Sequence, residues 1–150
     1  MKIEFANVEQ SKKLSELALS AAEELRGLDF NEEGWNRFIS SATSSEFEKR
    51  LYSSEFRIFC CMESDHMLGY ISLKDNEKID HLFVLSEARN KGVARLLWEA
   101  PKKNAMKNGA SGKFWVRSSS IAIPVYEKFG FICDGQCQNM GGISFQLMRL

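Results

Sequence analysis

The spacing of apolar residues changes near the middle of the chain, and this change constrains the fold more than any other feature. Before it, apolar side chains recur every three or four residues between Leu14 and Leu28, which predicts a helix with one buried face. From Phe56 onward the period becomes two, which is typical of strands. The strand-like runs occupy 56–62, 67–73 and 79–85. The short turn segments between them predict an antiparallel meander.

Weaker signals extend this pattern toward both ends of the chain. Asn7 and Gln10 have the spacing of a capping box at the start of the first helix, and Trp35 and Phe47 indicate two further helical stretches. The remaining expected elements are a strand at 2–6, a helix at 92–107, a strand at 113–116, a helix at 121–129 and strands at 131–134 and 143–150. The strand, helix, strand order around 92–107 predicts a right-handed parallel crossover. Pro101 predicts a kink or an end of that helix.

Composition limits the class of protein. Because 44% of the 150 residues are apolar, residues 1–150 are expected to form one domain with a core of its own. The 20 basic and 20 acidic residues cancel, so no net field favours a nucleic acid or an anionic membrane. No apolar run approaches the ~20 residues of a membrane span, and the first residues lack a signal-peptide core. We therefore expect a cytoplasmic protein without a nucleic-acid or membrane partner.

The cysteines give no sign of a structural cross-link or a metal centre. All 4 cysteines are expected to be reduced in a cytoplasmic protein. Cys133 and Cys137 lie four residues apart, but no Cys or His pair at zinc spacing accompanies them. We expect no metal site.

The segment Arg89-Asn90-Lys91-Gly92-Val93-Ala94 lies directly between a predicted strand and a predicted helix. The small residues Gly92 and Ala94 leave the first helical turn open, so its unpaired N–H groups and positive helix end suit a diphosphate. Arg89 and Lys91 add positive charge. The pattern is neither the dinucleotide-binding fingerprint nor a P-loop. Taken alone, the spacing fits an ordinary helix start with solvated basic residues better than a binding site, and its context reverses that preference.

Two motifs in register resemble those of one family. The run Ile79–Val84 followed by 89–94 resembles the R/Q-x-x-G-x-G/A signature, with its preceding strand, of the GNAT superfamily of N-acetyltransferases. The stretch AIPVYEKFGF at 122–131 is similar to the A-x-x-x-Y-E-K-x-G-F segment of that superfamily. The order of elements also matches over essentially the whole chain. The resemblance implies an α/β (α+β) fold with a mixed, mostly antiparallel twisted sheet, a splayed parallel strand pair and flanking helices.

The resemblance also implies a site for acetyl-CoA, as a co-substrate, where the fourth and fifth strands splay apart. In relatives the diphosphate lies on backbone N–H groups of the turn, and the pantetheine arm pairs with the end of the fourth strand. The cofactor-binding residues expected here are Leu82, Phe83, Val84, Arg89, Asn90, Lys91, Gly92, Val93, Ala94 and Ser119. Ser119 departs from the family, because many relatives carry an Asn there.

Acetyl transfer to an amine needs a neutral nucleophile and a proton for the departing thiolate. The resemblance implies that Tyr126 supplies this proton, whereas helix periodicity alone favours an aromatic that packs the helix on the sheet. Asp80, expected on the same strand face as Leu82 and Val84, is the candidate base, and a structural pairing with a lysine or an N–H explains it equally well. His81, expected on the opposite face, and water are the rivals, although a packed histidine is the commoner case.

These features predict an enzyme that transfers an acetyl group from acetyl-CoA to a primary amine of a small molecule in a ternary complex. No Cys or Ser lies in a nucleophile motif, so no covalent intermediate is expected. One alternative is a non-catalytic acyl-CoA-binding regulatory module, and another is an acetyltransferase that acts on a protein or peptide amine. A free edge at the closing strand would allow a homodimer.

Overall fold

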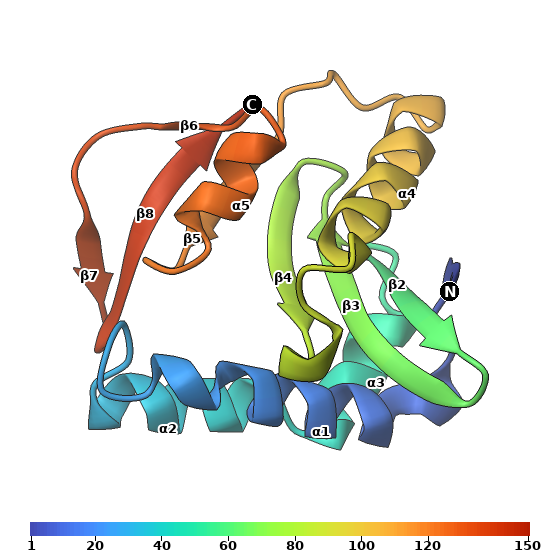
Figure 1. The fold of residues 1–150 in the computed structure, drawn as a ribbon, viewed down its shortest axis with the longest axis horizontal. Coiled ribbons are helices and arrows are strands. Elements are labelled where there is room, and N and C mark those ends of the chain that lie inside the picture. Colours follow the sequence, from blue (N-terminus) through green and yellow to red (C-terminus); the bar gives the residue numbers. More distant parts are fainter.

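One twisted sheet runs through the centre of the computed structural model, which describes residues 1–150 (Figure 1). The strands are β1 (Lys2–Phe5), β2 (Phe56–Glu63), β3 (His66–Lys74), β4 (Lys78–Val84), β5 (Trp115–Ser118), β6 (Ile132–Cys133), β7 (Gln138–Met140) and β8 (Ile143–Arg149). Their spatial order is β1-β2-β3-β4-β5-β8-β6, and β7 pairs with β8. Every pair is antiparallel except β4 and β5, which run parallel. The predicted meander and the predicted mixed sheet are confirmed.

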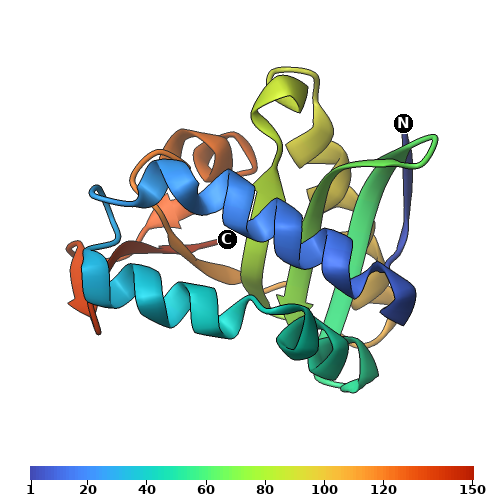
Figure 2. The same cartoon turned by 90° about the horizontal axis from the view of Figure 1, so that it is seen from below.

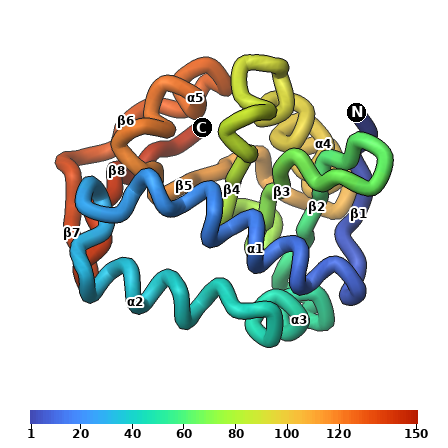
Figure 3. The backbone as a smooth tube through the Cα atoms, turned by 60° about the horizontal axis from the view of Figure 1, so that its bottom comes forward, coloured from blue at the N-terminus to red at the C-terminus, as the bar shows by residue number.

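Helices cover both faces of this sheet. They are α1 (Ser11–Ala22), α2 (Glu32–Ser41), α3 (Ser44–Tyr52), α4 (Val93–Lys107) and α5 (Ile123–Lys128). Figures 2 and 3 show α1, α2 and α3 together on one face, and α4 and α5 pack on the other. None of these helices combines the length and the apolar character that a membrane crossing requires.

The alternation of side chains along β2 supplies both faces with core residues. Each face has a core of 16 buried residues. Cys60 lies in the core under α1, α2 and α3, whereas Cys61 lies in the core under α4 and α5, and neither is exposed. Both behave as small apolar side chains, so this central strand is apolar on its two sides because both sides are covered.

One prediction about the long helices was wrong, the extension of the first helix to Leu28, and of the kink or end predicted at Pro101 the end does not occur. α1 ends at Ala22 and a 3-10 turn follows, so Leu28 lies outside the helix and is 64% exposed. Gly27, with a φ of 84°, takes the backbone out of the helical region just before Leu28. α4 continues through Pro101, because that proline lies on the buried stripe of Val93, Leu97 and Ala105. The packing of this stripe offsets the one hydrogen bond that proline removes.

The last part of the sheet also departs from expectation, because β7 was not predicted. All three residues of β7 are exposed, so no apolar alternation marks this strand in the sequence. The two-glycine turn at Gly141 and Gly142, both with positive φ, folds β7 back on β8 as a hairpin.

Helix α2 is fixed to this hairpin by a close contact between two glycines. A Cβ on Gly34 would clash with the carbonyl oxygen of Gly142, so the approach requires the absence of a side chain. The N–H of Asn31 donates to the same Gly142 carbonyl at 3.0 Å, and the N–H of Ser144 donates to the Asp29 carbonyl at 2.7 Å. The loop before α2 and the start of α2 are therefore tied to β8.

Candidate active site

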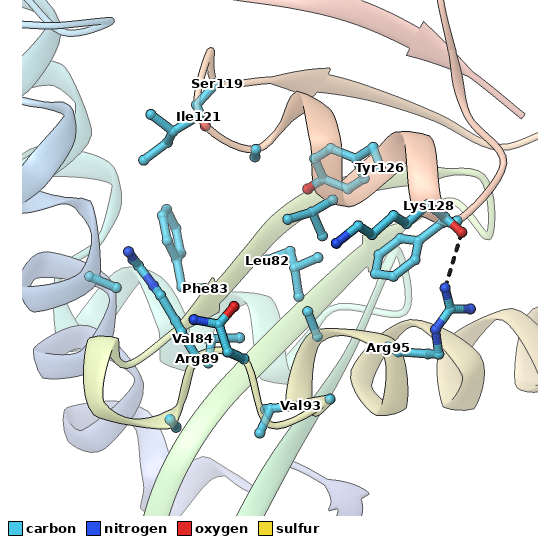
Figure 4. A pocket seen from close by; sticks show the side chains of 18 of the residues that line it. Leu82, Phe83, Val84, Arg89, Val93, Arg95, Ser119, Ile121, Tyr126 and Lys128 are labelled. Carbon is cyan, nitrogen blue, oxygen red and sulfur yellow. Dashed lines mark hydrogen bonds between the residues drawn. The ribbon is translucent and has the colours of Figure 1, made fainter.

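A cavity of about 400 Å³ lies where β4 and β5 separate, a size usual for small-molecule sites (Figure 4). Its walls come from the end of β4, the turn that follows, the start of α4, the β5–α5 loop and α5. The residues expected from the sequence that line it are Leu82, Phe83, Val84, Arg89, Asn90, Gly92, Val93, Ala94, Ser119 and Tyr126. Lys91 and Asp80 do not line it.

The strand pair opens because its ladder is short. β4 and β5 are paired only at Lys78 with Trp115 and Ile79 with Val116. Beyond Ile79, β4 keeps its partner β3 on one side and has no strand on the other. The edge of β4 from Leu82 to Val84 therefore presents backbone N–H and C=O groups toward the cavity, and an extended amide-bearing ligand could pair with them.

The turn between β4 and α4 collects free backbone donors. Asn90 and Gly92 both adopt left-handed backbone, with φ of 61° and 80°, and Gly92 is the N-cap of the 15-residue helix α4. No N–H from Asn90 to Arg95 donates a hydrogen bond to another backbone group. Alternating left-handed residues before a helix turn successive N–H groups to one side, and the helix adds its positive end. This arrangement of donors suits an anion.

The guanidinium of Arg89 is not free, contrary to the sequence expectation. Arg89 Nη1 donates to Glu24 Oε2 at 2.9 Å and Arg89 Nη2 donates to Glu24 Oε1, which makes a bidentate ion pair. Glu24 belongs to the 3-10 turn after α1 and, like Arg89, lines the cavity. The positive charge of Arg89, expected from the sequence to serve a bound diphosphate, is neutralised by this ion pair with Glu24. No local pattern indicates this ion pair, because 65 residues separate the partners.

Tyr126 lies on α5 and is 5% exposed. Its ring packs edge-on against Phe129 and Phe131, and its hydroxyl end is directed into the space between α5 and β4 (Figure 4). No hydrogen-bond partner within the chain is present for this hydroxyl. Burial raises the pKa of Tyr126 well above its ordinary value, so the phenol stays protonated throughout the physiological range.

A β-bulge changes the face on which Asp80 lies. Ser72 is opposite His81 while Leu73 is opposite Ile79, so Asp80 is the extra residue of β4. Ile79 and Leu82 consequently pack with the same core although they are three apart. Asp80 forms an ion pair with Lys78 (Nζ to Oδ1, 3.4 Å) instead of sharing a face with Leu82 and Val84. The sequence placement of Asp80 was wrong, because simple alternation does not anticipate a bulge.

His81 is enclosed by aromatic rings on the α3 side of the sheet. Its ring lies 5.5–6.1 Å from those of Phe38, Phe47, Tyr70 and Phe83, and Nδ1 shares a 2.9 Å hydrogen bond with the Tyr70 hydroxyl. Burial lowers the pKa of His81 to about 4, so the imidazole is neutral at pH 7. Burial opposes ionisation of Asp80, but the charge of His81 in its protonated form and the charges of Lys78 and Arg50 outweigh it and lower the pKa of Asp80.

Sequence reasoning missed a link between the two loops that border the site. Asp29 is 8% exposed, and its Oδ2 accepts hydrogen bonds from the N–H (3.1 Å) and the hydroxyl (2.9 Å) of Ser120. Ser120 directly follows Ser119, which lines the cavity. Asp29 therefore holds the β5–α5 loop in position, and only the folded chain brings these residues together. No cluster of three or more His, Cys, Asp or Glu side chains is arranged to hold a metal ion.

The fold and this cavity define a class of protein: an α/β domain with a cavity between splayed parallel strands, bounded by a turn of free backbone donors at the start of a helix. The family model described as "Acetyltransferase (GNAT) domain" matches residues 27–150. The chain therefore belongs to the GNAT acetyltransferase family, as its two motifs indicated. No curated protein sequence matches the chain significantly.

Solved structures share the whole fold at low sequence identity. A GCN5-related N-acetyltransferase from Rhodopseudomonas palustris has a TM-score of 0.83 and 21% identity, over 99% of this chain and 93% of that chain. The PaiA N-acetyltransferase from Thermoplasma acidophilum, in complex with coenzyme A, has a TM-score of 0.82 and 19% identity, over 99% and 98%. An aminoglycoside 6'-N-acetyltransferase complexed with coenzyme A has a TM-score of 0.71 and 14% identity, over 100% and 96%.

Proposed function

We propose that residues 1–150 act as one domain that transfers an acetyl group from acetyl-CoA to a primary amine of a small molecule, directly and in a ternary complex. The observation that carries the proposal is the meeting of three features in one cavity: the free N–H groups of the 90–95 turn, the open edge of β4 and the hydroxyl of Tyr126. Two structures of similar fold contain coenzyme A, which supports the same ligand here.

The cavity offers a matching surface to each successive part of acetyl-CoA, first the diphosphate and then the pantetheine arm. The diphosphate accepts hydrogen bonds from the turn at Asn90–Arg95, and the pantetheine amides pair with the edge of β4 from Leu82 to Val84. Val93, Val125 and Phe129 give the remaining wall its apolar character. Lys91, exposed outside the cavity, is available to the phosphates from the solvent side.

The transfer brings together the amine nitrogen, the carbonyl carbon of the thioester and the leaving sulfur. The neutral amine attacks the thioester carbonyl, the carbon–sulfur bond breaks, and the sulfur leaves as a thiolate that takes up a proton. Because the phenol of Tyr126 keeps its proton, it donates a hydrogen bond to the developing thiolate. Asp80 is ionised at neutral pH and paired with Lys78, and it is the candidate to take up, through water, the proton that the amine loses.

The experiment that tests the proposal measures thiol release. Purified protein is incubated with acetyl-CoA and a panel of polyamines, aminoglycosides, amino acids and peptides, and coenzyme A binding is measured separately by calorimetry. Release stimulated by an amine supports transfer. Binding of coenzyme A without stimulated release across the panel contradicts the enzyme and favours a regulatory acyl-CoA-binding module.

A further inference from the structure

Arg117 is an arginine with an aromatic support and no acidic partner. Its guanidinium carbon lies 5.7 Å from the ring centre of Trp115 and 5.2 Å from that of Phe145. No carboxylate of the chain forms an ion pair with it, and the residue is exposed. These cation–π contacts hold the guanidinium near the two rings and leave its N–H donors without a partner in the chain, so they are available to a carboxylate.

The register of the strands shows which face of the sheet Arg117 occupies. Val116 on β5 pairs with Ile79 on β4, and both are buried in the core under α4 and α5. Trp115 and Arg117 therefore point to the opposite face, where Lys78 also lies over the Trp115 ring at 5.3 Å. Ser119, two residues further along, lines the cavity. Arg117 thus lies on the face opposite to α4 and α5, two residues before the cavity-lining Ser119 and next to the point where β4 and β5 separate.

The charges on this face favour an anion. Its acidic groups near the splay are Asp80, which Lys78 neutralises at 3.4 Å, and Asp29, whose carboxylate accepts two hydrogen bonds from Ser120. Arg50 lies close enough to influence the pKa of Asp80, and its Nη1 is buried with no hydrogen-bond partner. The pair of Lys78 and Asp80 is neutral, so the charges of Arg117 and Arg50 leave this face with a net positive charge. A polycationic acceptor would be repelled by this surplus, whereas an acceptor with an acidic group would be attracted.

We propose that the acceptor is a small primary amine that carries a carboxylate, as an amino acid or a short peptide does, and that Arg117 binds this carboxylate. The inference rests on the proposed function. In the reaction, the amine nitrogen forms an amide bond with the acetyl carbon, the thioester bond breaks, and the coenzyme A thiol receives the proton. The carboxylate is unchanged, so Arg117 acts on acceptor specificity alone.

The test compares matched acceptors that differ only in this group. Amino acids and dipeptides are assayed against their C-terminal amides, together with polyamines and aminoglycosides, by thiol release. A bidentate, charge-assisted contact predicts a kcat/KM about 10- to 100-fold higher for the carboxylates. Arg117→Gln removes this preference through KM, and Arg117→Lys keeps part of it. Arg149→Gln is the control, because Arg149 is already paired with Asp134.

Binding is read separately so that a failure of transfer can be recognised. The coenzyme A complex is titrated with N-acetyl amino acids and with their amides while Trp115 fluorescence is followed, and Trp115→Phe identifies that signal. Binding that is selective for the acids and lost in Arg117→Gln supports the inference, with or without transfer. Equal responses to acids and amides, no response to either, or an acid preference that survives Arg117→Gln overturns it. Absence of transfer to every amine contradicts the proposed function instead.

Discussion

Replacing Gly92 with alanine separates the binding role of the 90–95 turn from its structural role. Gly92 has a φ of 80°, and a Cβ built there meets nothing within 4 Å, so Gly92→Ala introduces backbone strain without a clash. An L-residue in the left-handed region costs roughly 1–2 kcal/mol. Gly109, at the far end of α4, has a φ of 87° and equally open surroundings, so Gly109→Ala introduces the same strain outside the cavity.

The two sites differ in how firmly their backbone is held. The N–H groups of Asn108 and Ala110 both donate to Ala105, which fixes the turn at Gly109, whereas the N–H groups around Gly92 have no partner. Gly109→Ala should retain its conformation and lower the unfolding free energy by about 0.5–1 kcal/mol after the gain from a stiffer unfolded chain. That corresponds to a fall in Tm of roughly 2–3 °C. In Gly92→Ala the free turn should relax toward negative φ and lose little stability.

Coenzyme A must then restore the left-handed turn when it binds to Gly92→Ala. The strain of roughly 1–2 kcal/mol appears in the binding free energy, so the affinity should fall about 5- to 30-fold. Calorimetry of both variants with coenzyme A, and thermal unfolding of each, measure the two quantities. Wild-type affinity in Gly92→Ala together with an unchanged Tm would refute the assignment of the turn to the diphosphate, because the relaxed turn would then bind as well as the left-handed one.

Four further outcomes follow from the described contacts. Tyr126→Phe removes an oxygen that has no partner within the chain, so turnover should fall ~10²-fold with little change in coenzyme A affinity or Tm, and a turnover within about threefold of wild type would assign Tyr126 to packing. Asp80→Asn should lower the acetylation rate at neutral pH more than it weakens coenzyme A binding; an unchanged pH–rate profile would leave Asp80 as the partner of Lys78 alone. Asp29→Ala leaves the N–H of Ser120 unpaired, so KM for acetyl-CoA should rise about tenfold, and Ser120→Ala, which loses only the hydroxyl, should show a smaller rise. Since the pKa of His81 is about 4 when folded and 6.5 ordinarily, the unfolded chain binds the extra proton between these values, so Tm should fall as pH drops from 6.5 toward 4; a slope equal to wild type in His81→Gln would show that another group is responsible.

Much of the fold could be predicted because its signals are local. The apolar runs of β2 and β3, buried on both faces, and the apolar stripe of α4 arise from each element's own burial, so the sequence shows them directly. β7 carries no such signal, since its Gln138–Met140 side chains are all exposed and its place depends on β8. Pro101 was misjudged for a related reason, because packing of the helix stripe outweighed a local propensity.

The candidate site likewise contains features that a local pattern indicates and contacts that no local pattern indicates. The turn at 89–94 and Tyr126 were found by motif and spacing, and both line the cavity. The ion pair of Arg89 with Glu24 and the bond of Asp29 to Ser120 join residues 65 and 91 positions apart, which no periodicity can report. The position of Asp80 depends on a single extra residue in one strand, and a bulge shifts every later side chain to the other face.

The glycine contact between α2 and the β7–β8 hairpin has a consequence for the order in which the molecule assembles. Gly34 and Gly142 stand at opposite ends of the sequence, and closing so long a loop costs entropy that only later contacts return. The meander and α4 can form from neighbouring segments before this happens. We therefore expect the contact between α2 and the β7–β8 hairpin to form last during folding and to open first under native conditions. Amide hydrogen exchange at Asn31 and Ser144, whose N–H groups bridge the two segments, would register each such opening separately from global unfolding.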